Sequence, residues 1–345
     1  MRTFKKFGTD KLERKVIIRA VAISLALILV VCGVLFLLDR WESSTVDEPV
    51  TPQVSEDILE YNGKRYVQKN NLFSLLLIGL DETSEEINQH ESSYNNSQEA
   101  DFLMLLVFDS KNNTYSALHI NRDTIAKMDT YYADGKPGPS EYKQIALSHT
   151  FGDGKAQSCK NTVNAVQNLL EGVEVDAYIS VPMDVVGKVT DFVGGVDVTV
   201  LQDMTTINEA WTKGAVITLD KSNALQYVRT RYGLDESSNA VRMQRQQQFL
   251  EALFNKSVDA IGNDREFVEN FFSSDIMDNL EATQLTRIES IAKNLPDYKY
   301  TGVYELEGES KIVSASGDQQ NIEFTASEES IKESIINLYY EQIKE

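Results

Sequence analysis

The pattern of apolar and polar positions along the chain predicts a mixed α/β fold. Short apolar runs at 72–79, 102–108 and 115–120 have the length of buried strands, and a Lys-Asn-Asn turn at 111–113 joins the last two as a hairpin. Helical periodicity then alternates with further apolar runs. These predict helices at 161–170, 183–192, 222–228 and 240–258, and strands at 175–181 and 196–200.

The segments on either side of this α/β region have a different composition. Residues 39–70 are polar and contain two prolines, as in a linker, and residues 81–99 are predicted to form a mobile polar loop. We take residues 71–258 as the main domain. Residues 259–345 either extend it or complete it. They are predicted to contain helices at 266–277, 281–294 and 327–343, and a hairpin of strands 300–305 and 311–314.

The N-terminal region has the pattern of a membrane anchor. Residues 20–38 carry no charge and would form a helix of about 28 Å, enough to cross a bilayer. Residues 1–19 hold seven Lys or Arg and two acidic residues, a net of +5, which predicts a cytoplasmic N-terminus and an extracellular remainder. A cleaved signal peptide is the alternative, but bulky residues and Trp41 stand where small cleavage-site residues belong.

Charge and cysteine content exclude several classes of protein. The net charge is −20, and removing the +5 of residues 1–19 leaves −25, which disfavours nucleic acid as a partner. Cys32 lies in the apolar segment and Cys159 is the only cysteine outside it. An intramolecular disulfide and a cysteine-based metal site in the exported part are therefore excluded.

Arginine is concentrated in a way that lysine is not. The segment 72–256 contains ten scattered lysines but only five arginines, all within three short polar clusters. These five are Arg122, Arg229, Arg231, Arg242 and Arg245. Because a planar guanidinium donates two parallel hydrogen bonds to phosphate oxygens, the pattern favours a pocket for a polyphosphate. The alternative is a surface helix whose arginines pair with nearby acidic residues such as Asp235.

Two acidic positions are candidates for metal binding beside these arginines. If the strands at 102–108 and 115–120 pair as a hairpin, Asp101 and the Arg122-Asp123 pair lie at the same end of the sheet. Carboxylates beside phosphate-binding arginines commonly hold Mg²⁺ or Mn²⁺. The alternative is a turn aspartate with a local salt bridge. Farther along the chain, Arg242, Arg245 and Gln246 fall on one helix face behind Asn239, which has the position of an N-cap.

These motifs, in this order, resemble the LytR–CpsA–Psr family of bacterial cell-envelope proteins. The resemblance covers about residues 72–256. The matching motifs are Ala100-Asp101, Arg122-Asp-Thr124, Gly194-Gly-Val-Asp-Val198, Ala224-Leu-Gln-Tyr-Val-Arg-Thr-Arg231 and Arg242-Met-Gln-Arg-Gln-Gln-Gln248. It implies a three-layer α/β/α sandwich with a central mixed sheet, one preceding transmembrane helix, and an apolar tunnel for a polyprenyl chain.

The resemblance also implies a reaction, which is a Mg²⁺-assisted phosphotransfer from an undecaprenyl-diphosphate-linked glycan to peptidoglycan. Asp101, Asp123 and Arg122 would be catalytic. The five arginines with Gln246 would bind the diphosphate, and Asp101, Asp235 and Asn239 would bind the metal. Asn239 stands where the family usually has an aspartate, while His119, Asn121 and Lys221 also depart from the family pattern. Two other functions stay open: a non-catalytic binder of polyprenyl phosphates or envelope glycans, and a pyrophosphatase acting on the same lipids.

Overall fold

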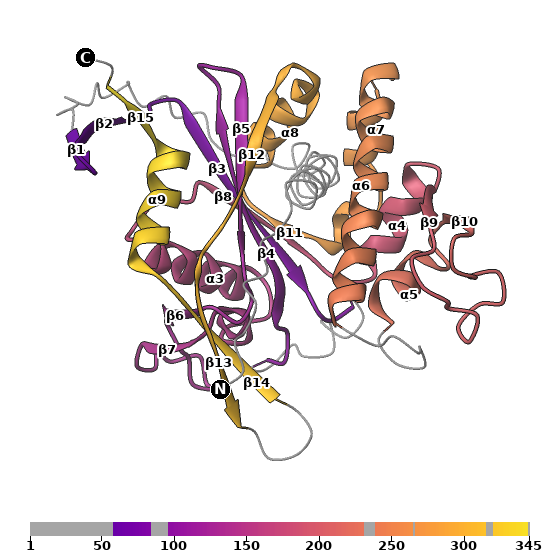
Figure 1. Cartoon of the computed structure of the whole chain (residues 1–345), viewed down its shortest axis with the longest axis horizontal. Helices are drawn as coiled ribbons and strands as arrows, with labels where there is room; N and C mark the ends of the chain where they lie inside the picture. The colour runs from indigo at the N-terminus through magenta and orange to yellow at the C-terminus, as the bar shows by residue number, and fades with distance from the viewer. Residues whose placement is uncertain (1–57, 84–95, 231–238, 265, 315–319, 344–345) are drawn as a thin grey trace, which may run out of the picture. The chain divides into compact units, whose positions relative to one another are not determined.

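The computed structural model describes residues 58–83, 96–230, 239–264, 266–314 and 320–343 (Figure 1). The described residues form two compact units: residues 186–263 make the smaller, and residues 58–185 together with those from 264 to 343 make the larger. The membrane helix expected at 20–38 lies outside the described residues. In the part that is described, none of the helices combines the length and apolar character that a bilayer crossing requires.

The larger unit is built on a six-stranded mixed sheet of order β11-β8-β3-β4-β5-β12. β3 (Leu72–Leu80) pairs antiparallel with β4 (Ala100–Asp109) and parallel with β8 (Ala177–Val181). β4 continues into an antiparallel pair with β5 (Thr114–Ile120), which confirms the hairpin expected from the sequence. β3 is buried along most of its length, and this explains its continuous apolar run, because a strand covered on both faces does not alternate.

Both edge strands of this sheet come from the last part of the chain. β11 (Glu281–Ala282) pairs antiparallel with β8, and β12 (Lys299–Glu305) runs parallel to β5. Two sequence predictions are therefore wrong: residues 281–282 are a strand and not helix, and β12 forms no hairpin with the strand that follows it. The backbone groups at a sheet edge need partners, and this tertiary requirement is invisible to local pattern.

Helices cover the sheet on both sides in Figure 1. α3 (Ala156–Leu169) and α9 (Glu328–Tyr339) share one buried apolar cluster with strand residues such as Ile78 and Leu105. α8 (Leu285–Lys293) lies on the other side, next to α7 (Phe267–Phe272). Three 3₁₀ helices, Ile145–Thr150, Met277–Asn279 and Leu295–Asp297, connect these elements.

Three small sheets complete the larger unit. β1 (Ile58–Tyr61), β2 (Lys64–Gln68) and β15 (Tyr340–Gln342) form one, so residues 58–68 are strands where a linker was expected. β6 (Ile125–Met128) pairs with β7 (Glu141–Gln144), and β13 (Gly308–Ser314) pairs with β14 (Gln320–Ala326).

The smaller unit holds the remaining helices that the sequence predicted. Its elements are α4 (Val185–Phe192), β9 (Val196–Thr199), β10 (Val216–Leu219), α5 (Ala224–Arg229) and α6 (Asn239–Asn263). β9 and β10 pair antiparallel. The buried rings of Trp211 and Tyr227 meet edge-on with centroids 5.5 Å apart, and Phe249 and Leu253 of α6 are also buried.

Candidate active site

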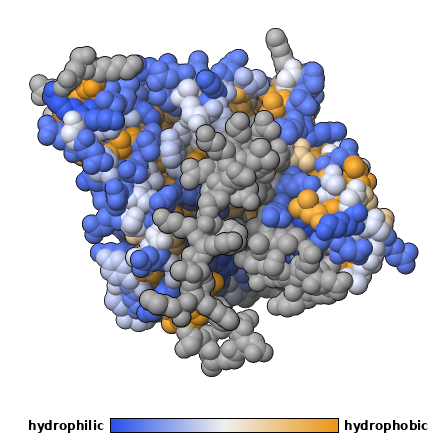
Figure 2. All heavy atoms as spheres, in the orientation of Figure 1, coloured by the Kyte–Doolittle hydropathy of each residue, from blue (hydrophilic) through white to orange (hydrophobic). Residues whose placement is uncertain are grey.

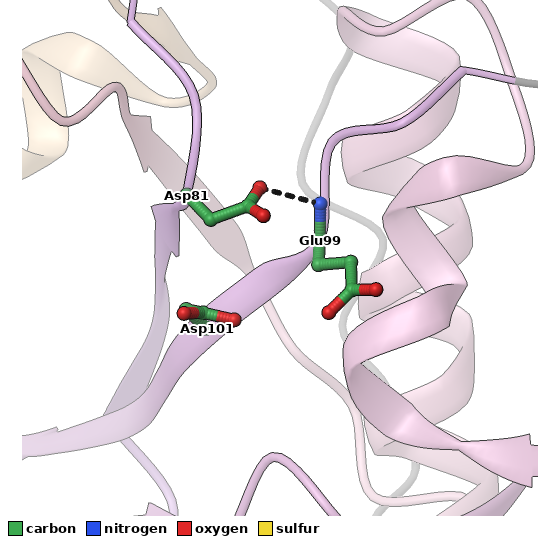
Figure 3. Close-up of side chains that lie close together, drawn as sticks. All are labelled: Asp81, Glu99 and Asp101. Carbon is green, nitrogen blue, oxygen red and sulfur yellow. Dashed lines mark hydrogen bonds between the residues drawn. The ribbon is translucent and has the colours of Figure 1, made fainter. Parts of the chain in front are cut away.

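Three carboxylates converge at one end of the central sheet (Figure 3). Asp81 follows the last residue of β3, Glu99 directly precedes β4, and Asp101 is the second residue of β4. One ligand oxygen from each lies within 4.8 Å of the others. The backbone N–H of Glu99 donates to Oδ1 of Asp81 at 2.8 Å, which ties the two strand ends together.

An irregularity in the β3–β4 ladder brings Asp101 into this group. Gly79 pairs with Phe102 and Leu80 pairs with Ala100, so Asp101 is an extra residue on β4 without a partner opposite. Such a bulge redirects a side chain and is frequent beside functional sites. The close approach also requires glycine at position 79, because a Cβ there would lie 2.9 Å from the Cβ of Phe102.

Arg122 joins this cluster from the segment after β5. Its guanidinium donates to the carboxylates of Asp101 and Glu99, and its Nε lies 3.7 Å from Oδ1 of Asp123. The predicted proximity of Asp101 to the Arg122-Asp123 pair is therefore confirmed. It follows directly from the β4–β5 hairpin, whose register places Leu103 opposite Ile120.

The electrostatics of this cluster favour a bound cation. Burial raises the pKa of Asp81 above its ordinary value, and burial likewise raises the pKa of Asp123 although the charge of Arg122 opposes it. Among the described residues, three of the four carboxylates of this group, those of Glu99, Asp101 and Asp123, pair with one guanidinium, that of Arg122. A hard divalent cation prefers oxygen ligands of this kind, and the donor set of Asp81, Glu99 and Asp101 fits Mg²⁺ or Mn²⁺.

The sequence does not single out Asp81 and Glu99, because its polar composition predicts a mobile loop at 81–99. The described ends of that segment are held in place: Gln98 is fully buried, and Asn96 donates to the carbonyl oxygens of His149 and Gly152. A signal was present at Asp81, which directly follows an apolar strand. An aspartate in that place lies at a strand end, as Asp101 does.

The other predicted site residues belong to the smaller unit. Arg229 is exposed in the last turn of α5. Arg231 and Asp235 lie outside the described residues. Asn239, Arg242 and Gln246 lie on the first turns of α6, where the structure does not describe their side chains, and Asn239 is the first residue of the helix.

Arg245 makes structural contacts that the sequence did not indicate. Its side chain is only 1% exposed, and its guanidinium donates to the carbonyl oxygens of Tyr227 and Thr230. These carbonyls end α5, where helix carbonyls lack partners within the helix. The guanidinium also lies 5.7 Å from the centre of the Tyr227 ring. Arg245 therefore joins α5 to α6.

The fold and the cluster define an α/β domain with a carboxylate–arginine site at one end of its sheet. The model of the LytR_cpsA_psr family matches residues 40–334, and the chain belongs to this family. This confirms the resemblance that the sequence motifs indicated.

Relatives and solved structures agree with this assignment. The polyisoprenyl-teichoic acid–peptidoglycan teichoic acid transferase TagU of Bacillus cereus is 27% identical over 214 residues, which are 62% of each chain. The chain thus spans less than two thirds of that relative. The structure of Lin1025 from Listeria innocua is similar with a TM-score of 0.51 and 27% identity, covering 78% of this chain and 98% of that one. TagV of B. subtilis shares the fold, with a TM-score of 0.54, 23% identity and coverage of 78% and 96%.

Proposed function

We propose that the protein is a phosphotransferase that moves a glycopolymer from an undecaprenyl-diphosphate carrier onto peptidoglycan. The observation that carries this proposal is the cluster of Asp81, Glu99 and Asp101 around Arg122. Phosphoryl transfer requires mainly positioning and neutralisation of negative charge, and this cluster combines carboxylates that could hold a cation with a guanidinium. The names of the relatives, which describe teichoic acid transferases acting on peptidoglycan, support it.

We further propose that Asp81, Glu99 and Asp101 hold Mg²⁺ or Mn²⁺. When bound there, the metal would neutralise charge on the diphosphate. Arg122 donates to Glu99 and Asp101 in this structure, and its guanidinium would donate to a phosphate oxygen once those carboxylates hold the cation.

Asp123 is our candidate for the general base. Burial raises the pKa of its carboxyl, which suits a group that accepts a proton. In the proposed reaction an acceptor hydroxyl oxygen bonds to the phosphorus that carries the glycan, and its proton passes to Oδ2 of Asp123. The bond from that phosphorus to the bridging oxygen breaks, and undecaprenyl phosphate leaves.

The location of this chemistry is also a proposal. A transmembrane helix at 20–38, with its N-terminus cytoplasmic, would hold the domain outside the cell, where the lipid carrier presents its glycan. We expect the whole domain to be a three-layer α/β/α sandwich. Arg229, Arg231, Arg242 and Gln246 remain candidates for diphosphate binding.

Turnover of a short undecaprenyl-diphosphate saccharide on peptidoglycan oligomers tests this function. The full chain in detergent should transfer the glycan with Mg²⁺, and lose transfer with a chelator. Asp101→Ala should be inactive, whereas Asp134→Ala, which removes an exposed carboxylate paired with Lys136, should be fully active. Release of undecaprenyl phosphate without transfer would show a pyrophosphatase, and tight lipid binding without turnover would show a binder.

A further inference from the structure

The C-terminal hairpin lies directly beside the Arg122-Asp123 segment. The backbone N–H of Phe324 in β14 donates to the carbonyl oxygen of Asp123 at 2.8 Å, and Thr124 and Phe324 form a parallel bridge. Phe324 itself is buried in the main apolar cluster. Because the pairing is parallel, Ile322 stands level with Arg122. The β13–β14 hairpin is therefore anchored next to the site.

Gln144, the last residue of β7, connects three parts of this region. Its Nε2 donates to Oδ1 of Asp123 at 3.2 Å and to the carbonyl oxygen of Ile322 at 2.7 Å. Tyr142 is two residues earlier on β7 and so shares the face of the strand that Gln144 occupies. Across the ladder the same face carries Ile125 and Lys127, whereas Ala126 and Met128 point into the core.

The β6–β7 and β13–β14 hairpins expose three large side chains in this region. Tyr142 is 73% exposed, Ile312 is 60% exposed and Ile322 is 39% exposed. Ile312 and Ile322 are direct cross-strand partners on β13 and β14. Tyr142 and these two isoleucines thus lie on two hairpins that Gln144 joins, through its bonds to the Ile322 carbonyl oxygen and the Asp123 carboxylate. We call Tyr142, Gln144, Ile312 and Ile322 the hairpin platform.

We infer that the hairpin platform binds the sugar rings of the acceptor glycan. A pyranose ring has an apolar C–H face, which stacks on an aromatic ring, and polar hydroxyl edges, which bond to amides and carboxylates. The platform offers both kinds of group side by side. This inference rests on the proposed function and identifies where its acceptor would lie.

The surface fits an acceptor glycan better than other occupants. A lipid donor is already held by its membrane chain and its diphosphate, whereas a polymer acceptor needs a surface of its own within reach of the proposed base. Binding to a membrane surface would require a wider apolar patch and an excess of basic residues. The net charge of −20 does not fit that requirement.

Saccharide binding to the full chain in detergent tests the inference. The probe is a soluble peptidoglycan tetrasaccharide of alternating N-acetylglucosamine and N-acetylmuramic acid, and saturation-transfer NMR reports its contacts. We expect Tyr142→Ala to weaken binding by about tenfold or more, whereas Tyr142→Phe keeps the ring and should bind within about twofold of the original protein. Ile322→Ser should weaken binding by a smaller factor.

Matched controls separate the platform from general surface effects. Tyr132, 57% exposed in the loop between β6 and β7, and Val216, 72% exposed in the smaller unit, are comparably exposed. Tyr132→Ala and Val216→Ser should leave saccharide binding unchanged. Equal losses of saccharide affinity in Tyr132→Ala and Tyr142→Ala would overturn the inference. So would sedimentation that shows the original protein to be a dimer and the Ile312→Ser variant to be a monomer, because the surface would then be an interface between two copies.

The same variants are also tested for binding of a short-chain polyprenyl diphosphate. This measurement distinguishes failure of the hairpin platform from failure of the proposed transferase function. We expect Tyr142→Ala to bind the diphosphate normally. If the original protein and Tyr142→Ala both bind the diphosphate, and both bind the tetrasaccharide equally well, the platform is refuted. The transferase proposal would then still stand.

Discussion

The carboxylate of Asp81 accepts a hydrogen bond from the backbone N–H of Glu99, with 2.8 Å between Oδ1 and the nitrogen. The two residues are 18 positions apart in the chain, and this bond joins the ends of the intervening segment at the edge of the site. The carboxylates of Asp81, Glu99 and Asp101 lie close to one another, and those of Glu99 and Asp101 also pair with Arg122. The site therefore combines an acidic half that suits a cation and a basic group that suits a phosphate.

The raised pKa of Asp81, one of the three proposed metal ligands, predicts a pH-dependent effect of Mg²⁺ on stability. A carboxyl whose pKa is higher in the folded state than in the unfolded state keeps its proton to a higher pH when the protein is folded. Stability therefore falls as pH rises through the window between the two pKa values. A bound cation offsets this loss only when the carboxylates are ionised. Mg²⁺ should raise the Tm by several degrees at pH 7 and by much less at pH 4.

A thermal-shift series from pH 4 to pH 8 checks this prediction, with Asp81→Asn as the companion variant. Without Mg²⁺ at pH 7 the variant should melt above the original protein, because it has lost the ionisation penalty while its amide oxygen still accepts from Glu99. Its Mg²⁺ shift should also shrink. A Mg²⁺ shift of equal size at pH 4 and pH 7 would argue against a carboxylate site.

Arg122→Lys tests whether the guanidinium geometry matters beyond its charge. The substitution retains the positive charge but loses the paired donors, so affinity for a short-chain polyprenyl diphosphate should fall by about tenfold or more. Calorimetry with Mg²⁺ present measures this. Arg229→Lys should weaken binding in the same way if Arg229 contacts the ligand. Arg287→Lys is the control, because that guanidinium lies over the ring of Phe73 at 4.4 Å.

Arg245→Met should destabilise the protein without acting on the diphosphate. The buried guanidinium donates to the carbonyl oxygens of Tyr227 and Thr230, and methionine would remove this donor from both. We expect a loss of about 3 kcal/mol in the free energy of unfolding, measured by denaturant titration. Diphosphate affinity of the folded fraction should stay within about twofold. A stable variant that no longer binds the ligand would instead restore Arg245 to the site.

Cys159 should be unreactive in the folded protein. Burial raises the pKa of its thiol, and its Sγ lies 3.7 Å from Nε2 of His149, whose own pKa burial lowers to about 4. The pair is therefore neutral and lacks the thiolate that reacts. In a Cys32→Ser background, Ellman's reagent should label the native protein at least about 100-fold more slowly than a free thiol, and label it rapidly in guanidinium. Rapid native labelling would contradict this prediction.

The sequence alone determined those features that depend on neighbours close in the chain. Apolar runs predicted β3, β4 and β5, because strands buried on both faces are continuously apolar. The turn between β4 and β5 then implied that Asp101 and Arg122 meet, since a hairpin brings its open ends together. Helical periodicity identified α3, α5 and α6 with only their ends displaced.

The tertiary structure decided what depends on residues far apart in the chain. Glu99 joins Asp81 across a segment whose polarity indicates only a loop. Arg245 is buried because its guanidinium donates to the carbonyl oxygens at the end of α5. The sequence of α6 alone does not indicate this contact. Phe324 reaches Asp123 from the far end of the chain. Such contacts form because buried backbone groups and sheet edges must find partners anywhere in the fold, and a local pattern carries no record of which partner they find.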